Sequence, residues 1–191
     1  MKSRLHIVDF RQGRGIVLPL TLILLVIISL LGIMALRNAT VGSQTMNGIR
    51  AYTATEMAAE SGLRYCEEVV KEAASPSAPP KYVAQIAQII PTAYGQAQPI
   101  VGPNDANAYW KRSASWAAAS ANRITVDTST TAGSKYTYPP QCIIEVMKNN
   151  SGTAYVITAR GISNDAQYDA TSGKVTSGSE VWVQSVLTPN T

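Results

Sequence analysis

The sequence predicts an α+β protein in which a long N-terminal helix, transmembrane in its first half, packs on a small antiparallel β-sheet. Three observations lead to this prediction. Residues 16–36 form an uncharged apolar run, a helical repeat of apolar residues continues to about Ala74, and β-branched runs separated by turn-forming residues follow in the C-terminal third. A chain of 191 residues has room for one domain with its own core, so we expect one anchored domain.

The apolar run at 16–36 has the length of a membrane-spanning helix. At about 1.5 Å per residue it matches the roughly 30 Å hydrocarbon core of a bilayer. Ordinary secretory signals are shorter and end at a small-residue cleavage site, whereas this run continues into a helical pattern, so we expect it to be retained. Pro19 is tolerated because it falls in the first turn of a helix beginning near Val17 or Leu18.

Charge predicts the orientation of this helix and the class of partner. The first 15 residues carry four basic residues against Asp9 alone, which leaves 12 basic and 11 acidic residues for the rest of the chain. Positive charge before the span places residues 1–15 in the cytoplasm and the residues after about 37 outside, as a single pass through a bacterial inner membrane. The nearly neutral body lacks the clustered positive charge that nucleic acid requires, so no nucleic-acid partner is predicted.

From 37 to 74 the pattern stays helical and becomes amphipathic. The expected buried face consists of residues that recur at spacings of four and three: Ala59, Leu63, Cys66, Val70 and Ala73. A proline-rich segment at 75–80 ends the helix, because proline disfavours helix in the residue before it. We expect the amphipathic half to pack on a globular head at 75–191. A plain membrane anchor with a stalk is the alternative.

The first part of the head, residues 81–134, is weakly patterned. Its composition of Ala, Ser, Pro and Asn indicates loops and short helices. Trp110 and Trp116 are the expected packing anchors in this part.

The rest of the head has the pattern of strands. Runs at 142–147 and 155–159 flank the turn-forming segment 149–152 and predict a hairpin. The alternating segment 181–186 predicts a third strand with one face toward the helix. Between them, the polar segment 164–179 is expected to be an exposed loop where partners would be met.

The two cysteines, Cys66 and Cys142, are far apart, and neither belongs to a CxxC pair. If the head lies in an oxidising compartment, a disulfide between them would close a loop of about 75 residues and contribute on the order of 4 kcal/mol. Two buried free thiols are the alternative.

The sequence contains no pattern for a catalytic, cofactor or metal site. Its one histidine, His6, lies among the first 15 residues, so the rest of the chain cannot supply a histidine base or ligand. Gly173-Lys174 lacks the remainder of a phosphate loop, and the oxygen-bearing residues at 164–172 miss the EF-hand spacing. We therefore predict a protein that is not an enzyme and has no cofactor.

Residues 14–22, which read Arg-Gly-Ile-Val-Leu-Pro-Leu-Thr-Leu, resemble the class III signal of type IV prepilins. Three further segments resemble the PilX-type minor pilins (PilX/PilW family): residues 58–64, 155–161 and 181–185. The resemblance covers both ends of the chain and leaves the middle unmatched. It implies a type IV pilin-like fold.

The same resemblance implies how the chain is processed. A prepilin peptidase would cut between Gly15 and Ile16, remove the leader 1–15 and leave Ile16 as a methylated N-terminus. Most major pilins have glutamate at the fifth mature position, where this chain has Leu20. Because an unpaired carboxylate in hydrocarbon is costly, its absence would suit a rare or tip-located subunit. Simple variation within the subfamily is the other explanation.

The resemblance implies a minor type IV pilin, a structural subunit that primes pilus assembly or sits at the tip and supports adhesion, aggregation or twitching motility. Its partners would be other minor pilins, the major pilin and a tip adhesin, first in the inner membrane and then in a pilus on the cell surface. Two alternatives remain: a minor pseudopilin of type II secretion, and a signal-anchored periplasmic enzyme or binding protein.

Overall fold

The computed structural model describes residues 17–126, 136–149 and 152–188. The chain divides into two compact units, Met1–Asn47 and Gly48–Thr191. Helix α1, Val17–Ala74, contributes its first part to one unit and its second part to the other. Its bounds confirm the predicted helix, with Pro19 in the first turn.

A four-stranded antiparallel sheet forms the centre of the second unit. Its strands run in the order β1-β2-β3-β6. Their bounds are Ile124–Thr125 for β1, Gln141–Asn149 for β2, Gly152–Ile162 for β3 and Glu180–Leu187 for β6. The predicted hairpin and third strand are confirmed, although turn residues 150–151 lie outside the described part. The short strand β1 falls in the segment expected to hold loops and short helices.

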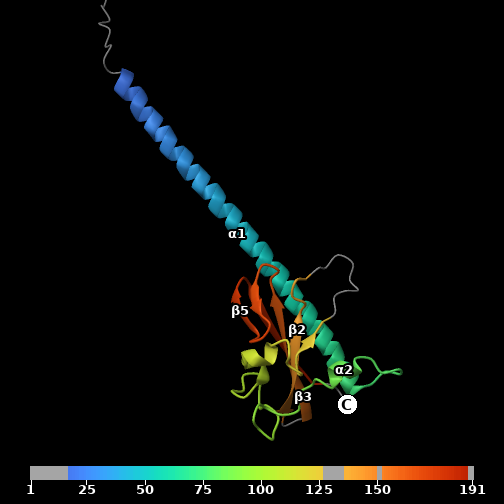
Figure 1. Cartoon of the computed structure of the whole chain (residues 1–191). Coiled ribbons are helices and arrows are strands. Elements are labelled where there is room, and N and C mark those ends of the chain that lie inside the picture. The colour runs from blue at the N-terminus through green and yellow to red at the C-terminus, as the bar shows by residue number, and fades with distance from the viewer. Residues whose placement is uncertain (1–16, 127–135, 150–151, 189–191) are drawn as a thin grey trace, which may run out of the picture. The chain divides into compact units, whose positions relative to one another are not determined.

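The second part of α1 packs on one face of this sheet (Figure 1). Cys66, Val69 and Val70 are fully buried there, against residues of β2 and β3 that include Ile144 and Ile157. Of the expected buried face, Ala59, Cys66 and Val70 are buried, and Leu63 packs at the edge of the cluster. This apolar contact confirms the predicted packing of helix on sheet.

Burial along α1 begins later than the amphipathic pattern suggested. Every residue from 17 to 50 is exposed, and Thr55 is the first buried residue of the helix. The segment 37–50 therefore has no buried face in this structure, although it belongs to the half of the helix that was expected to be amphipathic.

Short elements cover the other face of the sheet. Because successive residues of a strand point to opposite faces, Ile143 and Glu145 of β2 face away from α1. This second layer contains the 3₁₀ helices η1, Tyr109–Lys111, and η2, Ser113–Trp116. Helix α2, Val83–Ile86, instead packs its Ile86 against the cluster between α1 and the sheet. Trp116 is buried against Ile143 and Ile90, which confirms it as a packing anchor, while Trp110 is only partly buried.

The segment 164–179 is largely exposed, as predicted, but the prediction that it is a plain loop was wrong. This segment forms a second, two-stranded sheet from β4, Gln167–Asp169, and β5, Lys174–Ser177. It docks on the short helices, where the Tyr168 hydroxyl donates to the Trp116 carbonyl at 2.7 Å. Each strand is too short and too polar for its pattern to stand out from the turn residues around it.

Candidate functional site

Residues 17–36, at the start of α1, present a largely apolar surface without a charged residue. Its large apolar side chains are roughly half to three-quarters exposed, for example 74% for Leu18 and 65% for Leu20. Among the described residues, this is the one helix that is long and apolar enough to cross a membrane. It could therefore be a membrane anchor. The predicted cleavage and methylation residues, Gly15 and Ile16, lie outside the described residues.

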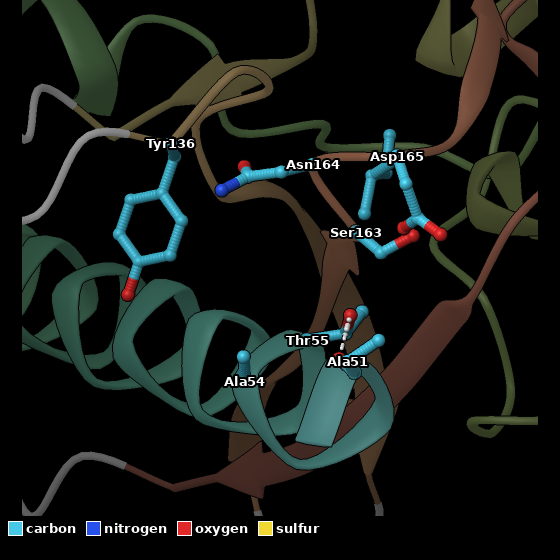
Figure 2. Close-up of a pocket in the computed structure, with 8 residues that line it drawn as sticks. Ala51, Ala54, Thr55, Tyr136, Ser163, Asn164 and Asp165 are labelled. Carbon is cyan, nitrogen blue, oxygen red and sulfur yellow. Dashed lines mark hydrogen bonds between the residues drawn. The ribbon is translucent and has the colours of Figure 1, made fainter. Parts of the chain in front are cut away.

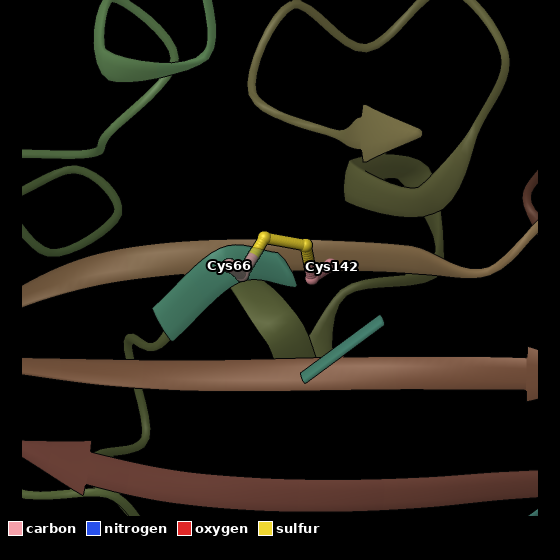
Figure 3. Close-up of a disulfide and its surroundings, with 2 residues drawn as sticks. All are labelled: Cys66 and Cys142. Atoms are coloured by element: carbon pink, nitrogen blue, oxygen red, sulfur yellow. A yellow bond between two sulfur atoms is a disulfide. The ribbon is translucent and has the colours of Figure 1, made fainter. Parts of the chain in front are cut away.

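A disulfide joins α1 to the sheet (Figure 3). It links Cys66 of α1 to Cys142 of β2, across a sequence separation of 76 residues and a Cα–Cα distance of 6.6 Å. Both cysteines are fully buried inside the apolar cluster between helix and strands. The alternative of two free thiols is thus wrong, and the helix is tied to the sheet both covalently and by apolar packing.

The helix and sheet also approach each other closely at two glycines. A Cβ atom on Gly161 of β3 would overlap the Thr55 carbonyl oxygen and lie 2.8 Å from the Ala59 nitrogen. A Cβ atom on Gly62 of α1 would lie 3.1 Å from the Pro140 Cβ. The segments 58–64 and 155–161, which were singled out together in the sequence, are thus in direct contact.

Arg160, from the same strand, is a buried cation on the other face of the sheet. It is 1% exposed and donates hydrogen bonds to the Gly173 carbonyl at 2.8 Å and to the Gln141 side chain at 2.7 Å. It also forms an ion pair with Glu180 at 3.1 Å. Burial lowers the pKa of the guanidinium, and the Glu180 charge opposes that effect. These partners supply the compensation that a buried charge requires.

Three aromatic rings surround this guanidinium. The distances from Arg160 Cζ to the ring centroids are 4.7 Å for Trp116, 5.2 Å for Tyr168 and 5.4 Å for Trp182. Trp182 of β6 stands directly opposite Arg160 in the sheet register. Cation–π attraction of this kind stabilises a charged group among rings.

Beside this cluster the surface is hollowed into a pocket of about 230 Å³. Its lining includes Arg160, Lys111, Lys174 and Glu180, together with all three tryptophans of the chain: Trp110, Trp116 and Trp182. The sequence prediction did not assemble this site. The sequence did contain one signal for this site, because Arg160 falls within a β-branched run. A buried arginine in a sheet is costly unless other residues pair with its charge.

Glu145 is a second buried charged group, with a structural role. It is 1% exposed, and its carboxylate accepts the backbone N–H groups of Tyr109 at 2.7 Å and Trp110 at 3.3 Å. Burial raises the pKa of Glu145, and these two hydrogen bonds oppose the rise. The carboxylate thereby holds helix η1 against β2.

A smaller cavity, of about 190 Å³, lies between α1 and the end of β3 (Figure 2). Ala51, Ala54 and Thr55 form its helical wall, with Tyr136 and residues 162–165 opposite. Thr55 uses its hydroxyl to donate to the Ala51 carbonyl, and the Ser163 hydroxyl accepts the Ser179 N–H. Both hydroxyls are thus engaged in holding the local structure.

The described residues include no group of three or more His, Cys, Asp or Glu side chains that could hold a metal ion.

Comparison of the chain with known protein families, with curated proteins and with solved structures gave no match.

Proposed function

We propose that this protein is a minor type IV pilin, a structural subunit that acts by association. The observation that carries the proposal is the division of α1. Its residues 17–50 are all exposed and begin with the apolar run that ends at Leu36. Its second part is buried on an antiparallel sheet and tied there by the Cys66–Cys142 disulfide.

The exposed apolar part requires an environment other than water. A surface of this size on a soluble monomer would drive aggregation, so the helix needs lipid around it before assembly and neighbouring helices afterwards. A pilin meets both needs in turn, because its helix leaves the membrane only by entering a bundle of other subunits' helices. The disulfide supports the extracytoplasmic placement of the head, because disulfides persist in oxidising compartments.

The cleavage motif links this architecture to pilus assembly, and the test is direct. Intact mass would be measured on the protein from native membranes, with and without the organism's prepilin peptidase. We expect loss of residues 1–15 and gain of a methyl group on Ile16, only when the peptidase is present. Gly15→Leu should block cutting, whereas Gly13→Leu, the matched change two residues earlier, should allow it. A chain uncut in all cases would favour a signal-anchored periplasmic protein.

The identity of residue 20, a leucine, also suggests where in the filament the subunit lies. Without a carboxylate at this place, the subunit does not need a neighbour's N-terminal amine as a partner in hydrocarbon, which suits a tip position. Immunogold labelling of the exposed head should therefore mark filament ends. Even labelling along the shaft would remove this argument, and a periplasmic fraction without surface filaments would favour a pseudopilin.

A further inference from the structure

The pocket beside Arg160 holds an aromatic surface that the fold leaves open. Trp110 and Trp116 use their indole N–H groups internally, donating to the carbonyls of Pro103 at 3.0 Å and Trp110 at 2.7 Å. Trp182 is 39% exposed, and its indole N–H has no hydrogen-bond partner among the described residues. The exposed part of this ring and one donor thus remain for a ligand.

The pocket also carries cations in excess. Glu180, the one carboxylate of the lining, is already paired with Arg160, so neither exposed lysine of the lining has an ion-pair partner within the described residues. Lys111 acts on the Asp105 carboxylate only at longer range. Lys111 donates one hydrogen bond, to the Asn104 carbonyl at 2.6 Å, and retains two donors. The side chain of Lys174 makes no hydrogen bond or ion pair within the part of the chain that the structure describes, although its backbone pairs with Asp169 in the β4–β5 sheet. The unbalanced charge favours an anionic ligand.

The wall of the pocket is held rigidly. Trp116 and Trp182 meet edge to face with centroids 4.7 Å apart, and Arg160 is fixed by three hydrogen bonds behind them. Gly173, whose carbonyl accepts one of these bonds, has a φ of 73° that only glycine adopts easily. A surface fixed in this way loses little freedom when a ligand binds.

We propose that this pocket binds an anionic pyranose, such as one uronic acid unit of an acidic polysaccharide. The C–H face of the sugar ring stacks on the exposed indole of Trp182, whose π face is negative. The sugar carboxylate pairs with Lys174 and Lys111, and a ring hydroxyl donates to Glu180 while another oxygen accepts the Trp182 N–H. An acidic peptide would use the lysines but would need neither the flat ring nor the acceptor. The proposal stands whether or not the chain is a pilin.

Tryptophan fluorescence tests this directly, because all three tryptophans of the chain line the pocket. The full-length protein in detergent would be titrated with trigalacturonic acid and, separately, with its methyl ester, which keeps the rings and removes the charges. We expect a saturable fluorescence change with the acid and at least about tenfold weaker binding of the ester. Equal binding of acid and ester, or no change with either, would overturn the proposal.

Two matched charge reversals locate the binding. Lys174→Glu lies in the pocket, whereas Lys148→Glu makes the same charge change on an exposed residue of β2 outside it. We expect calorimetry to show at least about tenfold weaker binding for Lys174→Glu and an unchanged affinity for Lys148→Glu. Equal losses in both variants would mean that the sugar responds only to overall charge, which contradicts a defined site.

Competition distinguishes the ligand class. Hexaglutamate and a short oligothymidylate carry comparable negative charge without a uronic acid ring. If neither displaces trigalacturonic acid at equal charge concentration, the pocket recognises the sugar. If either displaces it as well as the sugar itself does, the proposal fails in favour of an acidic protein or a single-stranded nucleic acid.

Discussion

Gly161 is the point of closest approach between β3 and helix α1, and there is no room for a side chain. A Cβ atom there would overlap the Thr55 carbonyl and crowd Ala59, both of which belong to helix backbone that cannot turn aside. We expect Gly161→Ala to lower the free energy of unfolding by about 1–3 kcal/mol or more, the usual cost of overpacking. Urea unfolding of the full-length chain, followed by tryptophan fluorescence, measures this in the head.

The control is the same substitution at Gly48, which lies in helix α1 itself and has no atom within 4 Å of the added Cβ. There the substitution should be neutral or gain up to about 1 kcal/mol from helix propensity. A Gly161→Ala protein as stable as the Gly48→Ala protein would show that helix and strand are not in close contact at this point.

Glu145 makes the stability of the head depend on pH. Burial raises its pKa above the ordinary value of 4.5, so the folded state holds the proton more tightly than the unfolded state. Stability from this group is therefore fully present below pH 4.5 and is lost as pH rises through the raised pKa. Glu145→Gln cannot ionise, and its amide oxygen can still accept the Tyr109 N–H.

The stability of Glu145→Gln relative to the wild type should therefore increase as the pH is raised from about 4 to 7. Urea midpoints of both proteins across this range give the difference. Exposed carboxylates with lowered pKa values, such as Asp105 and Asp169, are common to both proteins and cancel. A difference that stays constant or falls with pH would contradict the assigned burial of this carboxyl.

The residues that sequence reasoning found are those whose role follows from local chemistry or compartment. Cys66 and Cys142 were paired on the expectation that the head lies in an oxidising compartment, where two cysteines favour one disulfide. Arg160, Trp182 and Gly173 were not assembled, because they meet only through the β3–β6 register and the turn between β4 and β5. Pairings of that kind depend on long-range packing, which leaves no periodic trace in the sequence.

At the scale of elements, the disulfide joins helix α1 to strand β2 of the four-stranded sheet. Cys66 and Cys142 close a long loop, and the chain-entropy model gives this closure a contribution of about 4 kcal/mol. We expect dithiothreitol to lower the urea midpoint of the wild type, and the Cys66→Ala/Cys142→Ala protein to match or fall below the reduced wild type. The double variant should not respond to dithiothreitol. A wild-type midpoint unchanged by complete reduction would refute this contribution.

Elements were predicted well where they are long or strongly periodic. Helix α1 and strands β2, β3 and β6 have apolar repeats that persist over eight or more residues. Strands β1, β4 and β5 have two to four residues each, and their pairing is decided by what they dock against. Tertiary contacts rather than local propensity fix such short strands.

At the scale of the whole molecule, the two units differ in what keeps them folded. The described part of Met1–Asn47 is one helix without a single buried residue, so its apolar surface depends on lipid or on other chains. Gly48–Thr191 has its own apolar cluster, its own sheets and the disulfide. The buried residues of α1 begin at Thr55, well inside the second unit.

We therefore expect a fragment beginning at Gly48 to fold in water as a monomer when it is exported to an oxidising compartment. It retains every buried residue of α1 and both cysteines, and it lacks the exposed apolar run. Gel filtration, circular dichroism and non-reducing peptide mapping would test this, with the full-length chain expected to require detergent. A second fragment beginning at Glu60 removes Thr55, Ala58 and Ala59 from the core and should be markedly less stable. A Gly48 fragment that aggregates or lacks the disulfide would show that the head depends on the N-terminal helix to fold.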